Sequence, residues 1–251
     1  MMSVDALTVT KANELIQKSR FDLSLQQQKI VLYLISQIRP EDDDFQLYEF
    51  EITEFCRACG IDDDNGKNYQ NLKAAIKAIA DLSLWVTIGR EETLLRWIEK
   101  PYINFHSGTI RIRLDRDMKP FLLQLKKNYT RYELIWTLRF RSKYSIRLYE
   151  LIKSVHYHEL ESYERTFSLD ELRRMMGAEG YVTYQDFKKR ALNSAVAEIN
   201  SYSDKSISYQ PIKKGRAVQK IKFVIETKPI LERMQLQEDA ERELGLPELP
   251  E

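Results

Sequence analysis

The sequence of 251 residues is 43% hydrophobic and 31% charged, which is ordinary for a globular protein and enough for one large or two small cores. No apolar run approaches the ~20 residues of a membrane span, and the N-terminus lacks the basic and apolar regions of a signal peptide. Two cysteines give no disulfide framework, so we expect a cytoplasmic protein.

The net charge of +1 conceals three blocks of opposite sign. Residues 1–109 hold 12 Lys and Arg against 17 Asp and Glu, residues 110–230 hold 25 against 14, and residues 231–251 hold 2 against 7. A strongly basic segment inside an almost neutral protein favours a polyanionic partner, because each phosphate that is neutralised releases counterions. The alternative is a solvated basic surface without a partner.

Helical and extended patterns alternate in the first half. Ser24 is positioned to cap a strong helix that runs to Ile38, ahead of Pro40. The other elements expected here are a helix over Lys11–Arg20, a strand over Leu47–Ile52, a short helix over Thr53–Cys59, a helix over Tyr69–Leu82, and β-prone runs at Leu84–Ile88, Leu94–Ile98 and Ile110–Leu114.

The second half repeats this order. Tyr129–Val155 is expected to be mostly helical, and Phe167 is extended. Ser168 and Glu171 have the spacing of a capping box, which opens a short helix that ends at Gly177. A helix follows over Tyr184–Asn200, and then come two β-prone runs joined by Lys213-Lys214-Gly215-Arg216.

Two segments of the sequence recur at nearly the same offset. Phe50–Gly60 resembles Phe167–Gly177 at an offset of 117, and Tyr69–Lys73 resembles Tyr184–Lys188 at an offset of 115. Each copy reads as a short helix, a turn, a second helix and a hairpin, which is the outline of a winged helix. We therefore predict an α+β fold with two tandem winged-helix domains related by duplication. The expected divisions are 1–118, 119–230 and a partly disordered acidic tail over 231–251.

The second copy carries the stronger candidates for DNA recognition. In a helix-turn-helix the second helix enters the major groove, where arginine can pair with guanine and asparagine with adenine. Arg190 and Asn193 are therefore the expected base readers, with Lys188 and Lys189 beside them. A basic hairpin tip suits phosphates or a minor groove, and this role falls to Lys213, Lys214 and Arg216.

The first copy offers fewer cations on the equivalent helix. Gln70, Lys73 and Lys77 lie on its predicted outer face, and the two lysines suit phosphates. Asp81 and the acidic surroundings favour a weaker part in reading bases.

Several stretches resemble the plasmid replication initiators of the RepE and RepA type, which bind repeated origin sequences called iterons. The resemblance covers about residues 8–228, and its most specific part is the run Ser142-Lys-Tyr-Ser-Ile-Arg-Leu-Tyr-Glu-Leu-Ile152. The other matching stretches are Lys11-Ala-Asn-Glu-Leu-Ile16, Leu23-Ser-Leu-Gln-Gln-Gln-Lys-Ile30, Asp186-Phe-Lys-Lys-Arg190, Glu198-Ile-Asn200 and the Lys-Lys-Gly-Arg hairpin.

This resemblance implies a protein without catalytic activity, cofactor or metal that binds double-stranded DNA. A monomer would bind iterons to start replication, and a homodimer joined through the N-terminal domain would bind an inverted repeat and repress its own gene. Host chaperones and a helicase are further expected partners, and no membrane is. Two alternatives stay open: a rolling-circle nicking nuclease and a plain winged-helix repressor.

Three other motifs were weighed against ordinary structural roles. Cys56 and Cys59 have the spacing of a redox or zinc pair, but no second pair follows, so we expect structural thiols. His156-Tyr-His158 resembles a nuclease metal motif but lacks its apolar strand. Asp62–Gly66 reads as a solvated loop because Ile61 stands where a calcium loop needs its first ligand.

Overall fold

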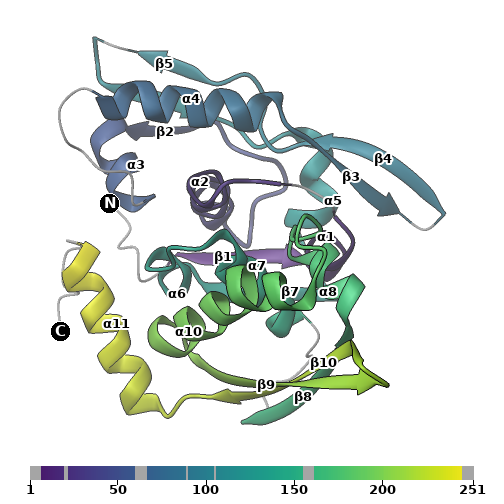
Figure 1. Ribbon diagram of the computed structural model, residues 1–251. Helices are drawn as coiled ribbons and strands as arrows, with labels where there is room; N and C mark the ends of the chain where they lie inside the picture. The colour runs from purple at the N-terminus through teal and green to yellow at the C-terminus, as the bar shows by residue number, and fades with distance from the viewer. Residues whose placement is uncertain are drawn as a thin grey trace.

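Short helices and strands alternate along the chain, in the arrangement of Figure 1. This computed structural model describes residues 7–19, 22–59, 67–88, 90–104, 106–154 and 161–244. The strands are β1 (Thr8–Ala12), β2 (Tyr48–Glu51), β3 (Ser83–Ile88), β4 (Glu91–Arg96), β5 (Tyr102–Asn104), β6 (Thr109–Ile112), β7 (Tyr129–Glu133), β8 (Ser162–Ser168), β9 (Lys205–Lys214) and β10 (Ala217–Thr227). The helices are α1 (Asn13–Lys18), α2 (Leu25–Ser36), α3 (Ile52–Ala58), α4 (Lys67–Asp81), the 3-10 turn Arg116–Met118, α5 (Lys119–Leu122), α6 (Ile135–Leu138), α7 (Lys143–Ser154), α8 (Leu169–Met175), α9 (Tyr184–Phe187), a π-helical turn (Lys188–Leu192), α10 (Asn193–Tyr202) and α11 (Ile230–Leu244).

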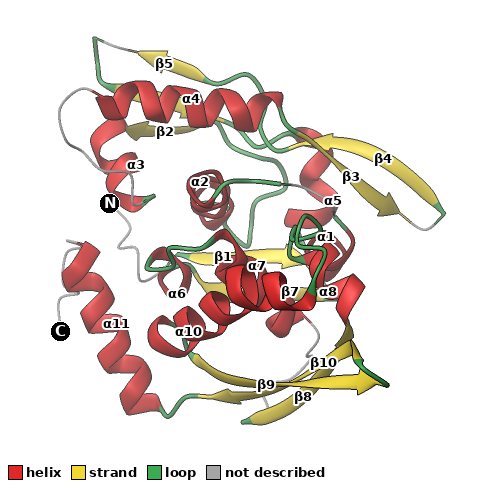
Figure 2. Cartoon of the chain, in the orientation of Figure 1, coloured by secondary structure: helices red, strands yellow, loops and turns green. Residues whose placement is uncertain are grey.

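Four small antiparallel sheets are formed by the described strands, as Figure 2 shows in yellow. The N-terminal half contains the sheet β2-β6-β5 and the separate hairpin β3-β4, and the C-terminal half contains the sheet β8-β10-β9. The fourth sheet pairs β1 with β7. Both hairpins, β3-β4 and β9-β10, extend toward the right side of the view in Figure 1.

The duplication is visible in the order of elements. A strand, a short helix, a longer helix and a hairpin follow one another as β2, α3, α4 and β3-β4, and again as β8, α8, α9–α10 and β9-β10. The prediction of two related winged-helix units in an α+β fold is confirmed.

Two expected helices contain strands instead. The helix expected over Lys11–Arg20 begins only at Asn13, and the stretch expected to be helical from Tyr129 begins with β7. The cause is tertiary pairing: Lys11 lies opposite Thr130 in the β1-β7 sheet, a partnership that local helix propensity does not reveal.

The segment that follows residue 118 contacts both halves of the molecule. Helix α7 packs against α10 of the second unit and against α1 near the N-terminus, and Figure 1 shows α7, β1 and β7 between the two units. The expected domain boundary at residue 118 therefore stays a prediction.

Helix α2 forms the centre of the N-terminal core. The Ser24 Oγ accepts from the backbone N–H of Gln27, and the Gln27 side chain accepts from the backbone N–H of Ser24, which completes a capping box. Ile30 and Leu34 are fully buried. The capping that we expected at Ser24 is confirmed.

Most of the expected acidic tail lies in helix α11, and its partial disorder stays a prediction. Helix α11 packs beside α6, buries Ala240, and places Glu243 Oε2 2.8 Å from Arg139 Nη2. Residues 245–251 lie outside the described residues. In the part of the chain that is described, no helix is long and apolar enough to cross a membrane.

Candidate nucleic-acid interface

Local hydrogen bonds fix both ends of α8, the first helix of the second helix-turn-helix. Ser168 Oγ accepts from the backbone N–H of Glu171 at 3.2 Å and caps α8. After α8, Gly177 adopts φ +65°, and the backbone N–H of Ala178 reaches the carbonyl of Arg173 at 2.8 Å. This pattern is a Schellman motif, in which glycine tolerates the left-handed conformation. The helix therefore ends where the sequence predicted.

The following helix begins at a second cap. Thr183 Oγ1 accepts from the backbone N–H of Asp186 at 3.0 Å and donates to its carboxylate at 2.7 Å. Together the two caps set the angle between α8 and the recognition helix, by which we mean residues 184–202.

The recognition helix contains a π-helical turn at Lys188–Leu192, where the N–H of Asn193 bonds to the carbonyl of Lys188. Four fully buried side chains follow one another at intervals of four residues, namely Phe187, Ala191, Ala195 and Ile199. In a regular α-helix each interval would drift by about 40° around the axis. A π turn holds more residues and reduces the drift. The regular α-helix expected over this stretch is therefore wrong in one turn.

The exposed side of this helix carries the expected base readers. Lys189, Arg190 and Asn193 are exposed, and Lys188 is half-buried. The Arg190 side chain is 64% exposed, and its Nε lies 3.9 Å from Asp186 Oδ1. An exposed pair of this kind contributes little, so the guanidinium remains available to a ligand.

The hairpin β9-β10 forms the wing of this unit. Lys214 pairs with Ala217 across a two-residue turn in which Gly215 adopts φ +63°, a conformation that favours glycine. Lys213, Lys214 and Arg216 are all exposed at this tip. The structure adds exposed Lys220, which sequence reasoning missed although it lies on the same basic strand.

The first unit presents a less basic surface. Gln70, Lys73 and Lys77 are exposed along α4, as expected. Lys77 forms an ion pair with Asp81, and both side chains are well exposed, so this carboxylate reduces the positive charge at the end of the helix. The structure thus brings the three residues onto one surface, where one of the two lysines is paired with a carboxylate.

Two residues from stretches that resemble the family hold the recognition helix against the rest of its unit. Glu198 Oε2 accepts from the backbone N–H groups of Arg141 and Ser142, ahead of α7. Asn200 bonds with both the N–H and the carbonyl of Ile207, at the start of the wing. These side chains are therefore used in packing the unit together.

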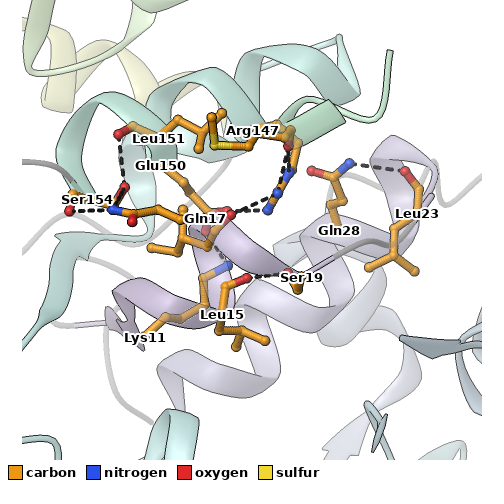
Figure 3. Close-up of polar contacts among 12 residues, drawn as sticks. Lys11, Leu15, Gln17, Ser19, Leu23, Gln28, Arg147, Glu150, Leu151 and Ser154 are labelled. Carbon is orange, nitrogen blue, oxygen red and sulfur yellow. Dashed lines mark hydrogen bonds and ion pairs between the residues drawn. The ribbon is translucent and has the colours of Figure 1, made fainter. Parts of the chain in front are cut away.

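A buried polar network joins the N-terminal segment to α7 and α8 (Figure 3). Arg147 donates to the carbonyls of Ile16 at 3.0 Å and of Met175 at 2.7 Å. Glu150 forms an ion pair with Lys11 and accepts from the hydroxyl of Tyr132 at 2.7 Å. Burial lowers the pKa of Lys11 against the opposing effect of Glu150.

The motifs to which we gave ordinary structural roles form no metal or redox site among the described residues. Cys56 and Cys59 are both buried and are not joined by a disulfide, and burial raises the pKa of Cys59 well above its usual value. Within the part of the chain that is described, no cluster of three or more His, Cys, Asp or Glu side chains could hold a metal. His156, His158 and the loop 62–66 lie outside the described residues.

Two helix-turn-helix units, each followed by a hairpin, define a double winged-helix DNA-binding protein. The sequence matches the model described as initiator replication protein, WH1, over residues 8–153, and that of initiator Rep protein, WH2, over residues 168–225. The chain belongs to this family of replication initiators.

Two individual relatives and a solved structure are also similar to this chain. A replication initiation protein of Escherichia coli is 26% identical over 230 residues, which cover 88% of this chain and 70% of the relative. The PI protein of Escherichia coli is 32% identical over 149 residues, which cover 53% of this chain and 48% of that protein. A crystal structure of Pi initiator protein in complex with iteron DNA has the same fold, with a TM-score of 0.72 and 22% identity across 89% of this chain and 98% of that one.

Proposed function

We propose that this protein starts the replication of a plasmid by binding sequence-specifically to repeated duplex sequences, the iterons, in the origin. The observation that carries the proposal is the exposed set Lys189, Arg190 and Asn193 on a capped recognition helix beside a basic wing. The Pi initiator that shares the fold was crystallised with iteron DNA, which supports the same ligand for this family member.

Both units take part in this binding. The second unit reads bases through Arg190 and Asn193, and its wing contacts phosphates through Lys213, Lys214 and Arg216. The first unit contacts the neighbouring turn of the duplex through Gln70, Lys73 and Lys77. A cytoplasmic location follows from a DNA partner, and host chaperones and a helicase are the partners that initiation requires.

The experiment that tests the function is footprinting on the DNA that flanks the gene. We expect evenly spaced protected repeats, with affinity near 10⁻⁹ M at physiological salt that falls steeply as salt rises. Uniform weak protection without repeats would contradict the proposal. A plasmid carrying the protected repeats should replicate only when the protein is supplied, whereas a plain repressor would bind without supporting replication.

Catalysis has no part in the proposed activity. Binding and bending of the duplex are sufficient for an initiator that recruits other proteins, and membership of a DNA-binding initiator family supports this reading. A supercoiled origin incubated with the protein and Mg²⁺ or Mn²⁺ should stay uncut. Covalent attachment to a 5′ end would instead identify the nicking nuclease.

A dimer that represses the gene is a second proposed state, and a surface of the first unit favours it. Trp85 and Leu94 lie directly opposite each other in the β3-β4 hairpin and are 52% and 51% exposed. Trp97 and Trp136, in contrast, are buried in the core. An exposed apolar pair of this size suits a second copy of the chain, as expected for dimerisation through the N-terminal domain.

A further inference from the structure

The side chain of Asn193 is held by the wing of its own unit. The Tyr209 hydroxyl donates to Asn193 Oδ1 at 2.8 Å, which joins β9 to the first residue of α10. The tyrosine ring lies 6.1 Å from the ring of Phe223, which is fully buried, and the two residues are paired across β9 and β10. The phenol is thus anchored to the sheet while Asn193 is exposed.

In this structure Asn193 Oδ1 faces the phenol, so the other end of the amide faces outward. Burial raises the pKa of Tyr209 to about 12, so the phenol keeps its proton and remains a donor at neutral pH. An amide that receives this bond at Oδ1 directs its two N–H donors away from the wing. Asparagine pairs with adenine through both its oxygen and its nitrogen, whereas guanine presents only acceptors, O6 and N7, in the major groove.

We propose that Tyr209 is a positioning residue for base recognition, which fixes Asn193 as a hydrogen-bond donor and so makes it select guanine instead of adenine. The inference rests on the proposed function and deepens it by assigning the base class at one position. It replaces the pairing with adenine that asparagine alone would suggest. In the first unit the position equivalent to Asn193, counted from Tyr69 as Asn193 is from Tyr184, is Ala78. The first unit therefore has no asparagine amide to be positioned in this way.

The test is selection of bound duplexes from a pool of ~25 randomised base pairs, enough for two turns. The unaltered chain, Asn193→Ala and Tyr209→Phe are compared as full-length proteins. Asn193→Ala should relax one base position and so identify the pair that Asn193 reads. At that position the unaltered chain should select guanine. Tyr209→Phe should admit adenine, with the guanine-to-adenine ratio reduced about 5- to 100-fold.

Three controls separate positioning from general damage. Tyr209→Phe keeps the ring against Phe223, so its unfolding midpoint and its binding to a non-specific duplex should match the unaltered chain. Tyr129→Phe removes a hydroxyl from an exposed residue outside the interface and should leave the selected sequence unchanged. The double variant Asn193→Ala with Tyr209→Phe should relax the position no further than Asn193→Ala does.

Each contrary result has a distinct meaning. Selection of adenine by the unaltered chain at the Asn193 position would overturn the inference and leave the proposed function standing. An unchanged guanine preference in Tyr209→Phe would do the same. Failure of the unaltered chain to enrich any sequence would overturn the proposed function, and the inference with it.

Discussion

Lys11 of β1 and Glu150 of α7 form an ion pair whose side chains are 3% and 1% exposed. The pair joins two stretches near opposite ends of residues 8–153, which match the WH1 family model. Arg147, on the same helix, donates to the carbonyl of Met175 at the end of α8. Residues 145–152, which belong to the stretch that most closely resembles the family, are thus buried at the junction of the two units.

Removing one charge from this network should destabilise the whole fold. Glu150→Gln leaves Lys11 and Arg147 buried without their carboxylate, and we expect the free energy of unfolding to fall by about 3–5 kcal/mol. Urea titration measures the change. Glu14→Gln, which breaks the exposed pair with Lys18, is the matched control and should cost under ~1 kcal/mol. Equal losses in both variants would contradict this role.

Asp204 should make stability depend on acid. Burial by itself would raise its pKa, but Lys153, Lys205 and the Tyr149 hydroxyl outweigh burial and lower the pKa below 3.8. The unfolded chain then takes up the proton more readily, so the stabilisation is complete above pH 3.8 and is lost as pH falls through the folded-state pKa.

Urea titration between about pH 7 and pH 2 tests this linkage. The difference in unfolding free energy between the unaltered chain and Asp204→Asn should shrink as the pH falls below 3.8. Asp170→Asn, at a carboxylate whose side chain is 95% exposed, should show no comparable trend. A constant difference for Asp204→Asn would show that the carboxylate is not responsible.

Arg190→Ala should relax the choice of base at one position of the iteron. The loss of a good arginine contact to guanine costs about 1–3 kcal/mol, and affinity for non-specific DNA should change much less. Competition with singly substituted duplexes measures the effect. Arg242→Ala removes another well-exposed arginine, from the acidic helix α11, and should change neither quantity. Normal discrimination by Arg190→Ala would exclude this base contact.

Lys213→Ala and Lys214→Ala should weaken binding to all duplexes alike. Each lost phosphate contact reduces the slope of log affinity against log salt by about 1. Titrations at several salt concentrations give the slope. Lys18→Ala, at an exposed lysine of α1, is the control and should leave the slope unchanged. A change restricted to one DNA sequence would point to a base contact instead.

Trp85→Glu should reduce dimerisation without unfolding the first unit. Its side chain is already half exposed, so the new charge opposes association while the buried neighbours Leu84 and Val86 keep the hairpin in place. Sedimentation equilibrium measures the association constant. Leu231→Glu, on an exposed apolar position of α11, is the control. Loss of the dimer in that variant alone would transfer the interface to the C-terminal helix.

Sequence patterns predicted those elements that local chemistry determines. The caps at Ser24 and Ser168, the stop at Gly177 and the turn at Gly215 each depend on a few neighbouring residues, and all are present. The exposure of Arg190 and Asn193 followed from apolar periodicity. Their contact with DNA stays a prediction.

Sequence patterns did not predict the features that depend on contacts between distant segments of the chain. Strand β1 exists because β7 pairs with it, and a run of five residues beside a helix start gives no sign of that partner. The bond from Tyr209 to Asn193 depends on the path of the wing back across the recognition helix. The π turn could have been suspected from buried apolar residues at intervals of four, since a regular helix does not keep such intervals in line.

The π-helical turn allows the recognition helix to change its length by one residue in evolution. A deletion of one codon between Lys188 and Leu192 would convert it to a regular turn, and most of the adjustment would fall on the solvent-facing residues. The side chains on the exposed face would then take new positions around the axis, while the buried face would keep its contacts with the core.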